Sequence, residues 1–223
     1  MSKEDNIMIS EKSQNTSFYL ELGQLTAESV NHLAPSFDHL PPNPYADGEF
    51  RLRRYSRFTV EQGSLNRLPT QTFVQDKSIN HFQGDVVRSY EEIDDSIVRD
   101  DAFIELFQHF QTMANVADGT PIEVHQLRIF ADHKSAEVAP EGVHQDGFDR
   151  IGIYVMQRHN IEGGSINVHL DKNSPALISH HFDKGEFVVL NDRKFFHSAQ
   201  PIQPTNGDKG YMDVFVLTAN SVH

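Results

Sequence analysis

The chain of 223 residues contains no cysteine. Disulfide bonds, thiolate metal sites and cysteine nucleophiles are therefore excluded. Long hydrophobic runs are also missing, so no segment approaches the length that crosses a membrane, and the polar residues 1–17 do not resemble a signal peptide. These absences lead us to expect a soluble protein of the cytoplasm, without a membrane partner.

Positive charge is scarce, because 19 Lys and Arg residues stand against 32 Asp and Glu residues, a formal net charge of −13 at pH 7. Binding to a phosphate backbone requires a cationic surface, so we expect no nucleic-acid partner. The sequence also lacks internal repeats, low-complexity segments, a glycine-rich phosphate loop and a Ser-His-Asp pattern. Nucleotide binding and serine-type hydrolysis are therefore not indicated.

The length suits one domain that buries a sizeable core. Residues 1–17 are rich in Ser, Lys, Glu and Asn, a composition typical of a flexible terminus. We therefore place a single domain at residues 18–223 after a flexible segment at residues 1–17.

The most informative stretch is a His-x-Asp triplet, formed by His144 and Asp146. Side chains two residues apart on an extended segment point the same way, so this pair can bind one metal ion. His197, from a distant strand, would complete a two-histidine, one-carboxylate site, which leaves positions open on iron for oxygen chemistry. A His-x-Asp triplet also arises by chance in a chain with 13 His residues. The neighbouring sequence must therefore decide whether this triplet is a metal site.

Those surroundings have strand character. Short apolar runs and alternating patterns predict strands at residues 151–156, 165–170, 186–190, 194–197 and 211–218. Residues 18–22 and 122–130 are further candidates, and a hairpin is expected around residues 80–84. Strands on both sides of the three candidate ligands suit a small antiparallel barrel with a site in its mouth.

Two segments have helical patterns. Thr26 can cap a helix that runs to about His32, with an apolar stripe of Ala27, Val30 and Leu33. Asp100 and Asp101 suit the start of a second helix, because carboxylates stabilise the positive end of the helix dipole. Its apolar residues recur at helical spacing and predict a core-facing stripe: Phe103, Leu106, Phe107, Phe110 and Met113.

An arginine-rich stretch follows Gly48. Arg51, Arg53, Tyr55 and Arg57 share one strand face by period two. If that face looks inward, it forms a wall that binds a substrate carboxylate; if it looks outward, it is a solvated cationic face.

Three other histidines compete less well for the metal. His125 lies on the strand face opposite Gln126 and Arg128, and we expect a structural, hydrogen-bonded side chain. His180 and His181 are adjacent and point apart on extended backbone. The polar loop at residues 132–140 precedes the triplet and is a candidate substrate gate.

Together these residues resemble a known family, the bacterial iron(II)/2-oxoglutarate dioxygenases that hydroxylate free amino acids, which includes the L-isoleucine dioxygenases. The resemblance spans roughly residues 45–218. It rests on the following stretches: Gly48-Glu49-x-Arg51-x-Arg53-x-Tyr55-Ser56-Arg57, His125-Gln126-Leu127-Arg128, His144-x-Asp146, Asn160-Ile161-x-Gly163-Gly164, Phe196-His197-Ser198-Ala199-x-Pro201-Ile202 and Tyr211-x-Asp213-Val214-x-Val216-Leu217-Thr218.

The resemblance implies a mainly β fold with flanking helices, a double-stranded β-helix of the jelly-roll or cupin type. It also implies that His144, Asp146 and His197 bind Fe(II), with 2-oxoglutarate and O2 as cosubstrates. The expected products are succinate, carbon dioxide and a hydroxylated small molecule, most simply a free amino acid.

One position departs from the family pattern. Between Tyr211 and Asp213 the family has an arginine that pairs with the distal carboxylate of 2-oxoglutarate, and this chain has Met212. A thioether cannot neutralise a carboxylate. We expect Arg128, beside Gln126 on one strand face, to reach inward as the replacement, and we expect Lys209 to be a solvated turn residue.

Three hypotheses therefore stay open at the level of the sequence. The first is a 2-oxoglutarate-dependent hydroxylase with a relocated anchor for the cosubstrate. The second is an iron oxygenase that does not use 2-oxoglutarate, with Met212 lining its pocket. The third is a non-catalytic module that retains the metal ligands. The sequence identifies neither the substrate nor the oligomeric state.

Overall fold

The computed structural model describes residues 20–46, 48–74, 77 and 84–221. The flexible segment expected at residues 1–17 lies outside the described residues. The hairpin expected around residues 80–84 lies outside them too, apart from Gly84.

A large antiparallel sheet dominates the fold. Its seven strands follow the spatial order β1 (Leu20–Gln24), β9 (Glu186–Asn191), β5 (Arg150–His159), β12 (Gly210–Ala219), β4 (Ile122–Ala131), β2 (Arg51–Glu61) and β3 (Ser64–Arg67). Two small sheets accompany it. One has three strands in the order β10 (Phe196–Ala199), β7 (Ile166–His169) and β8 (Ile178–His180), and the other pairs β11 (Ile202–Pro204) with β6 (Ile161–Gly163). The five strands predicted around the triplet are confirmed, with ends that differ by a few residues.

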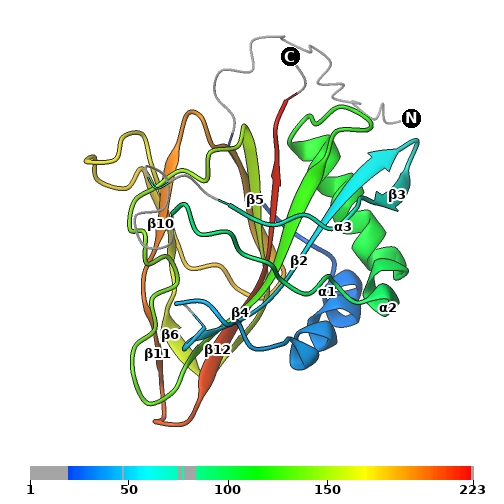
Figure 1. Cartoon of the computed structure of the whole chain (residues 1–223). Coiled ribbons are helices and arrows are strands. Elements are labelled where there is room, and N and C mark those ends of the chain that lie inside the picture. The colour runs from blue at the N-terminus through cyan, green and yellow to red at the C-terminus, as the bar shows by residue number, and fades with distance from the viewer. Residues whose placement is uncertain (1–19, 47, 75–76, 78–83, 222–223) are drawn as a thin grey trace, which may run out of the picture.

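The helices cover one side of the large sheet, and β6, β10 and β11 lie on the other (Figure 1). They are α1 (Ala27–Leu33), the 3-10 helix η1 (Ala34–His39), α2 (Asp95–Val98) and α3 (Asp101–Met113). Thr26 caps α1 by accepting from the Ser29 amide, and Asp100 caps α3 by accepting from the Ala102 amide. Both predicted helices are confirmed, and the predicted stripe of α3 is buried except for the half-buried Met113.

Consequently the central strands of the large sheet are buried on both faces. On the helix side, Phe215 and Leu217 of β12 join the cluster that contains the aromatic residues of α3. On the other side, Met212 and Val214 of the same strand join a second cluster between the sheets. Two antiparallel sheets that enclose one core are the arrangement of a double-stranded β-helix, the expected fold class.

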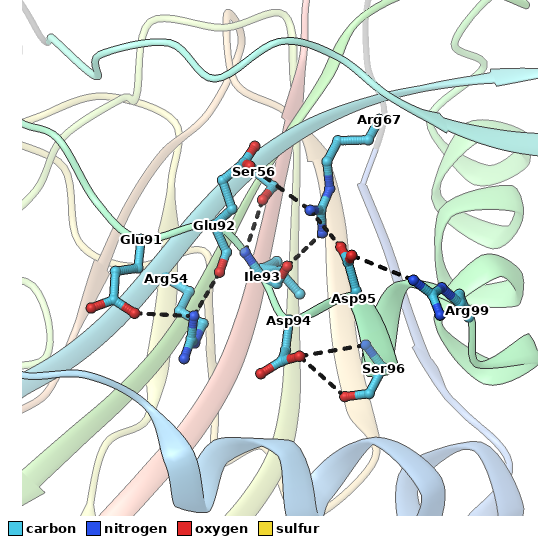
Figure 2. Close-up of polar contacts among 10 residues, drawn as sticks. All are labelled: Arg54, Ser56, Arg67, Glu91, Glu92, Ile93, Asp94, Asp95, Ser96 and Arg99. Atoms are coloured by element: carbon cyan, nitrogen blue, oxygen red, sulfur yellow. Dashed lines mark hydrogen bonds and ion pairs between the residues drawn. The ribbon is translucent and has the colours of Figure 1, made fainter.

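A polar network fastens the segment before α2 to the outer strands (Figure 2). The Ser56 hydroxyl accepts from the Ile93 amide at 2.9 Å, and Arg54 Nη1 donates to the Glu92 carbonyl at 2.8 Å. Arg67 Nη1 forms an ion pair with Asp95 at 2.8 Å. These contacts fix the course of the chain just after residues 88–90, which contribute to the site described below.

Within the described residues, each helix is too short or too polar to cross a membrane.

Candidate metal centre and its pocket

Backbone pairing brings the two candidate histidines together. The His144 amide donates to the His197 carbonyl and the His197 amide donates to the His144 carbonyl, both at 2.9 Å. The imidazole centroids lie 4.3 Å apart. Asp146 follows two residues after His144 and turns its carboxylate to the same side, as the alternation of an extended segment requires.

The three side chains converge on one point. Asp146 Oδ1 lies 3.6 Å from His144 Nε2, and Asp146 Oδ2 lies 3.5 Å from His197 Nε2. One ligand atom from each residue falls within 4.8 Å of the others. Among the described residues this is the one group of three or more potential metal ligands, so the expected triad is brought together.

Nδ1 of each imidazole, the ring nitrogen that faces away from Asp146, lies near an oxygen. His144 Nδ1 lies 2.9 Å from the Gly142 carbonyl, and His197 Nδ1 lies 3.5 Å from Asp192 Oδ1. An oxygen at Nδ1 fixes the proton there and leaves the Nε2 lone pair for a metal. Two neutral imidazoles and one carboxylate on a single side fit Fe(II), with its other coordination positions open.

The electrostatics of the group favour a cation. Burial lowers the pKa of His197, but the neighbouring carboxylates of Asp146 and Asp192 outweigh it and raise that pKa to about 10. Burial raises the pKa of Asp146, yet the two imidazoles hold it well below its usual value. Without a metal the centre therefore retains a proton, and a bound cation takes the place of that positive charge.

Asp192 was not identified from the sequence, where Asn191-Asp192 indicated only a turn. The turn is present, and the Asp192 side chain is completely buried beneath the centre. Its Oδ2 accepts from the amides of Asp146 at 2.8 Å and Gly147 at 3.0 Å. The same carboxylate therefore positions the triplet and one imidazole.

The triad lies in the wall of a cavity of about 140 Å³. A water molecule needs roughly 10–15 Å³ by this measure, so the cavity accommodates a small molecule. The rest of its wall is largely apolar, with Ile151, Ile153, Ile166, Val214 and Val216 among its lining residues. An apolar cavity with a few polar groups is the usual form of a small-molecule site.

The arginine stretch contributes a cationic wall. Arg51 and Arg53 line the cavity, with Arg51 Nη2 donating to the Val138 carbonyl and Arg53 Nη1 to the Tyr90 hydroxyl. Arg88 lines it as well and was not identified from the sequence, because residues 73–90 carry no clear pattern.

Tyr55 and Arg57 share the face of Arg51 and Arg53 but lie beyond the cavity. Tyr55 packs against Phe73 and His125, with ring centroids at 5.6 and 4.8 Å. Arg57 lies 3.9 Å from Glu123. Their expected contact with substrate therefore has no support from their placement.

Gln126 and Arg128 require a correction, because their side chains point to the helix side of the large sheet. Gln126 Nε2 donates to Ser36 Oγ at 2.7 Å. Arg128 forms two hydrogen bonds with Asp213, at 2.7 and 2.8 Å, and a third with Asp38 at 2.9 Å. The opposite face of β4, which carries His125, looks into the cavity, so the expected inward reach of Arg128 is wrong.

The remaining expectations concern the loops and the other polar residues. His125 lines the cavity without joining the metal group, and Met212 lines it too. Val138 and Ala139 place the 132–140 loop at the cavity; a gating role for it stays a prediction. Lys209 is exposed and pairs with Asp132 at 3.0 Å, as expected of a turn residue.

Fold and site together define a non-haem iron oxygenase of the double-stranded β-helix class. A family model described as 2OG-Fe dioxygenase matches residues 34–218, and the chain belongs to that family. Its members are enzymes that use Fe(II), 2-oxoglutarate and O2 on a small-molecule substrate, which supports the first of the three hypotheses. No curated protein matches the chain.

Solved structures agree on the fold. A bsmA homolog from Methylobium petroleophilum PM1 has a TM-score of 0.74 at 22% identity, over 87% of this chain and 81% of that one. IDO from Bacillus thuringiensis has a TM-score of 0.72 at 18% identity, over 91% of this chain and 94% of that one. The Fe(II)/(alpha)ketoglutarate-dependent dioxygenase TqaL has a TM-score of 0.67 at 17% identity, over 88% and 75%.

Proposed function

We propose that this enzyme hydroxylates an aliphatic C–H bond of a free amino acid or a small amino-acid derivative. The observation that carries the proposal is the composition of one cavity, which is lined both by the metal group and by Arg51, Arg53 and Arg88. In a chain with a net charge of −13, three arginines around one small cavity indicate an anionic ligand.

An amino acid fits this cavity better than a simple carboxylic acid. Glu141 lines the cavity together with the arginines, so the lining offers a negative charge for an ammonium group as well as positive charges for a carboxylate. Aliphatic side chains line the space beside the metal group, including Ile151 and Ile153. A zwitterion with an aliphatic side chain matches all three features.

In this proposal each group of residues in the cavity has a separate role. When bound, iron with 2-oxoglutarate and O2 supplies the oxidant that attacks the C–H bond. His144, Asp146 and His197 would hold the iron from one side, and Asp192 would fix the Nδ1 proton of His197. Arg51 and Arg53 would orient the substrate, since a carboxylate held by guanidinium groups fixes which carbon faces the metal. The apolar walls exclude water.

Succinate release in the presence of Fe(II), 2-oxoglutarate and O2 tests the proposal. We expect at least one free amino acid from an aliphatic panel to stimulate succinate formation, and its methyl ester, which lacks the carboxylate charge, to stimulate it far less. Arg53→Met should raise the KM for that amino acid, whereas Arg99→Met, at an exposed arginine outside the cavity lining, should not. Equal stimulation by acid and ester, or none by any amino acid, would overturn the substrate assignment.

A further inference from the structure

Arg158 of β5 lies directly opposite Met212 of β12. The two strands change register between Asp213 and Val214, and a bulge of this kind re-aims the side chains beyond it. Ile151 and Val155 of β5 face the inter-sheet core, so strict alternation would send Arg158 to the helix side. The register shift instead turns it toward the side of Met212, and Arg158 Nη1 lies 3.6 Å from Met212 Sδ.

Two neutral groups contact the guanidinium of Arg158. Its Nη2 donates to the Gly163 carbonyl and its Nη1 contacts the Met212 sulfur. Within the described part of the chain, no carboxylate lies within ion-pair distance of it, and Asp183 acts only at longer range. Burial lowers the pKa of this arginine. A partly buried cation with neutral contacts is costly to retain unless an anion joins it.

Gly164 lets the backbone pass close to this guanidinium, because a side chain there would crowd it. Gly164 has φ +70°, and a Cβ there would lie 3.1 Å from Arg158 Nη1 and 3.4 Å from Met212 Sδ. Met212 lines the cavity and its sulfur contacts Nη1, whereas Arg158 is not itself among the lining residues. A thioether chain is flexible and can shift to let a ligand reach the arginine.

We propose that Arg158 binds the carboxylate of 2-oxoglutarate that is distal to the oxoacid group. The oxoacid end of the cosubstrate belongs at the metal, and its far carboxylate needs a cation that Met212 cannot supply. Arg51, Ile129, Met212 and Arg158 form one row across four strands. Arg51 and Arg158 stand at opposite ends of this row, which separates the substrate carboxylate from that of the cosubstrate.

This inference does not rest on the identity of the oxidised molecule, because it concerns the cosubstrate alone. Binding is therefore measured without turnover, by anaerobic titration of the Fe(II)-loaded protein with 2-oxoglutarate or with pyruvate, followed by the visible absorption of the chelate. Pyruvate has the same oxoacid group and lacks the distal carboxylate, so the ratio of the two Kd values isolates the contact to that carboxylate.

In Arg158→Met we expect the Kd of 2-oxoglutarate to rise roughly 10- to 100-fold, the effect of losing a charge-assisted hydrogen bond. The Kd of pyruvate should stay unchanged. Arg158→Lys should retain part of the preference for 2-oxoglutarate, and Arg99→Met, the exposed control, should retain all of it. The double variant Arg158→Met with Met212→Arg should recover the preference for 2-oxoglutarate over pyruvate, because β12 then supplies a guanidinium at the position opposite residue 158.

Two results would overturn the proposal. Unchanged binding of 2-oxoglutarate in Arg158→Met would show that another cation holds the distal carboxylate. Equal loss of affinity for both oxoacids, without recovery in the double variant, would show that Arg158 only supports the structure.

Discussion

The Asp192 carboxylate lies 3.5 Å from Nδ1 of His197, while Nε2 of the same imidazole faces Asp146 at 3.5 Å. His197 is thus held between two carboxylates, the half-buried Asp146 of the candidate ligand set and the fully buried Asp192 beneath it. Asp192 also accepts from the amides of Asp146 and Gly147. It is therefore a positioning residue for two of the three candidate ligands at once.

Asp192→Asn should weaken Fe(II) binding about 10- to 100-fold, the usual cost of losing such an outer partner. The substitution keeps the size of the side chain but removes the charge that fixes the Nδ1 proton. Metal titration of the apoprotein measures the effect. Asp118→Asn, at an exposed position of the loop before β4, serves as the control. A variant at position 192 with the affinity of the wild type would show that His197 orients itself without Asp192.

His125 should make the metal-free protein less stable in acid. Its ring is packed among aromatic side chains, and burial, assisted by Arg53, lowers its pKa well below the usual value. The unfolded chain takes up a proton at this histidine as the pH falls through about 6.5, and the folded chain does not, so stability decreases there. His125→Phe should therefore lose less thermal stability than the wild type between about pH 7.5 and about pH 5.5. An equal loss in both proteins would contradict a neutral, buried His125.

Arg128 should contribute to stability and not to cosubstrate binding. Arg128→Met leaves the fully buried Asp213 without its partner, and breaking such a pair costs about 3–5 kcal/mol in the free energy of unfolding. Burial raises the pKa of Asp213 to about 6 although Arg128 opposes it. Since protonation removes the uncompensated charge, the loss measured by chemical denaturation should be smaller near about pH 5 than near about pH 8. A loss of 2-oxoglutarate binding in the folded variant would contradict this division of roles.

The sequence was sufficient for most of the fold. The strands around the triplet show short apolar runs or alternation, and Phe103, Phe107 and Phe110 recur at helical spacing, so local pattern and tertiary burial agree there. Alternation could not decide which face of β4 looks inward. Both faces of this strand are buried, His125 at 7% exposure and Gln126 at 1%, because helices cover one and the second sheet the other.

The parts of the site that sequence reasoning missed depend on contacts between distant segments. Asp192 has the sequence signature of a turn, and only the fold places it beneath His197. Arg88 comes from a stretch without periodicity, and Arg158 faces Met212 only because of a register shift in the β5 and β12 pair. A local pattern contains no information on any of these three relationships.

Fe(II) binding by the apoprotein under anaerobic conditions tests the central claim most directly, namely that His144, Asp146 and His197 form one iron site. The wild type and His125→Phe should each bind one Fe(II) per chain, because His125 lines the cavity outside the metal group. His144→Ala, Asp146→Ala and His197→Ala should each lose that binding while remaining folded. Stoichiometric iron in any of these three variants, or its loss in His125→Phe, would contradict the assignment of the site.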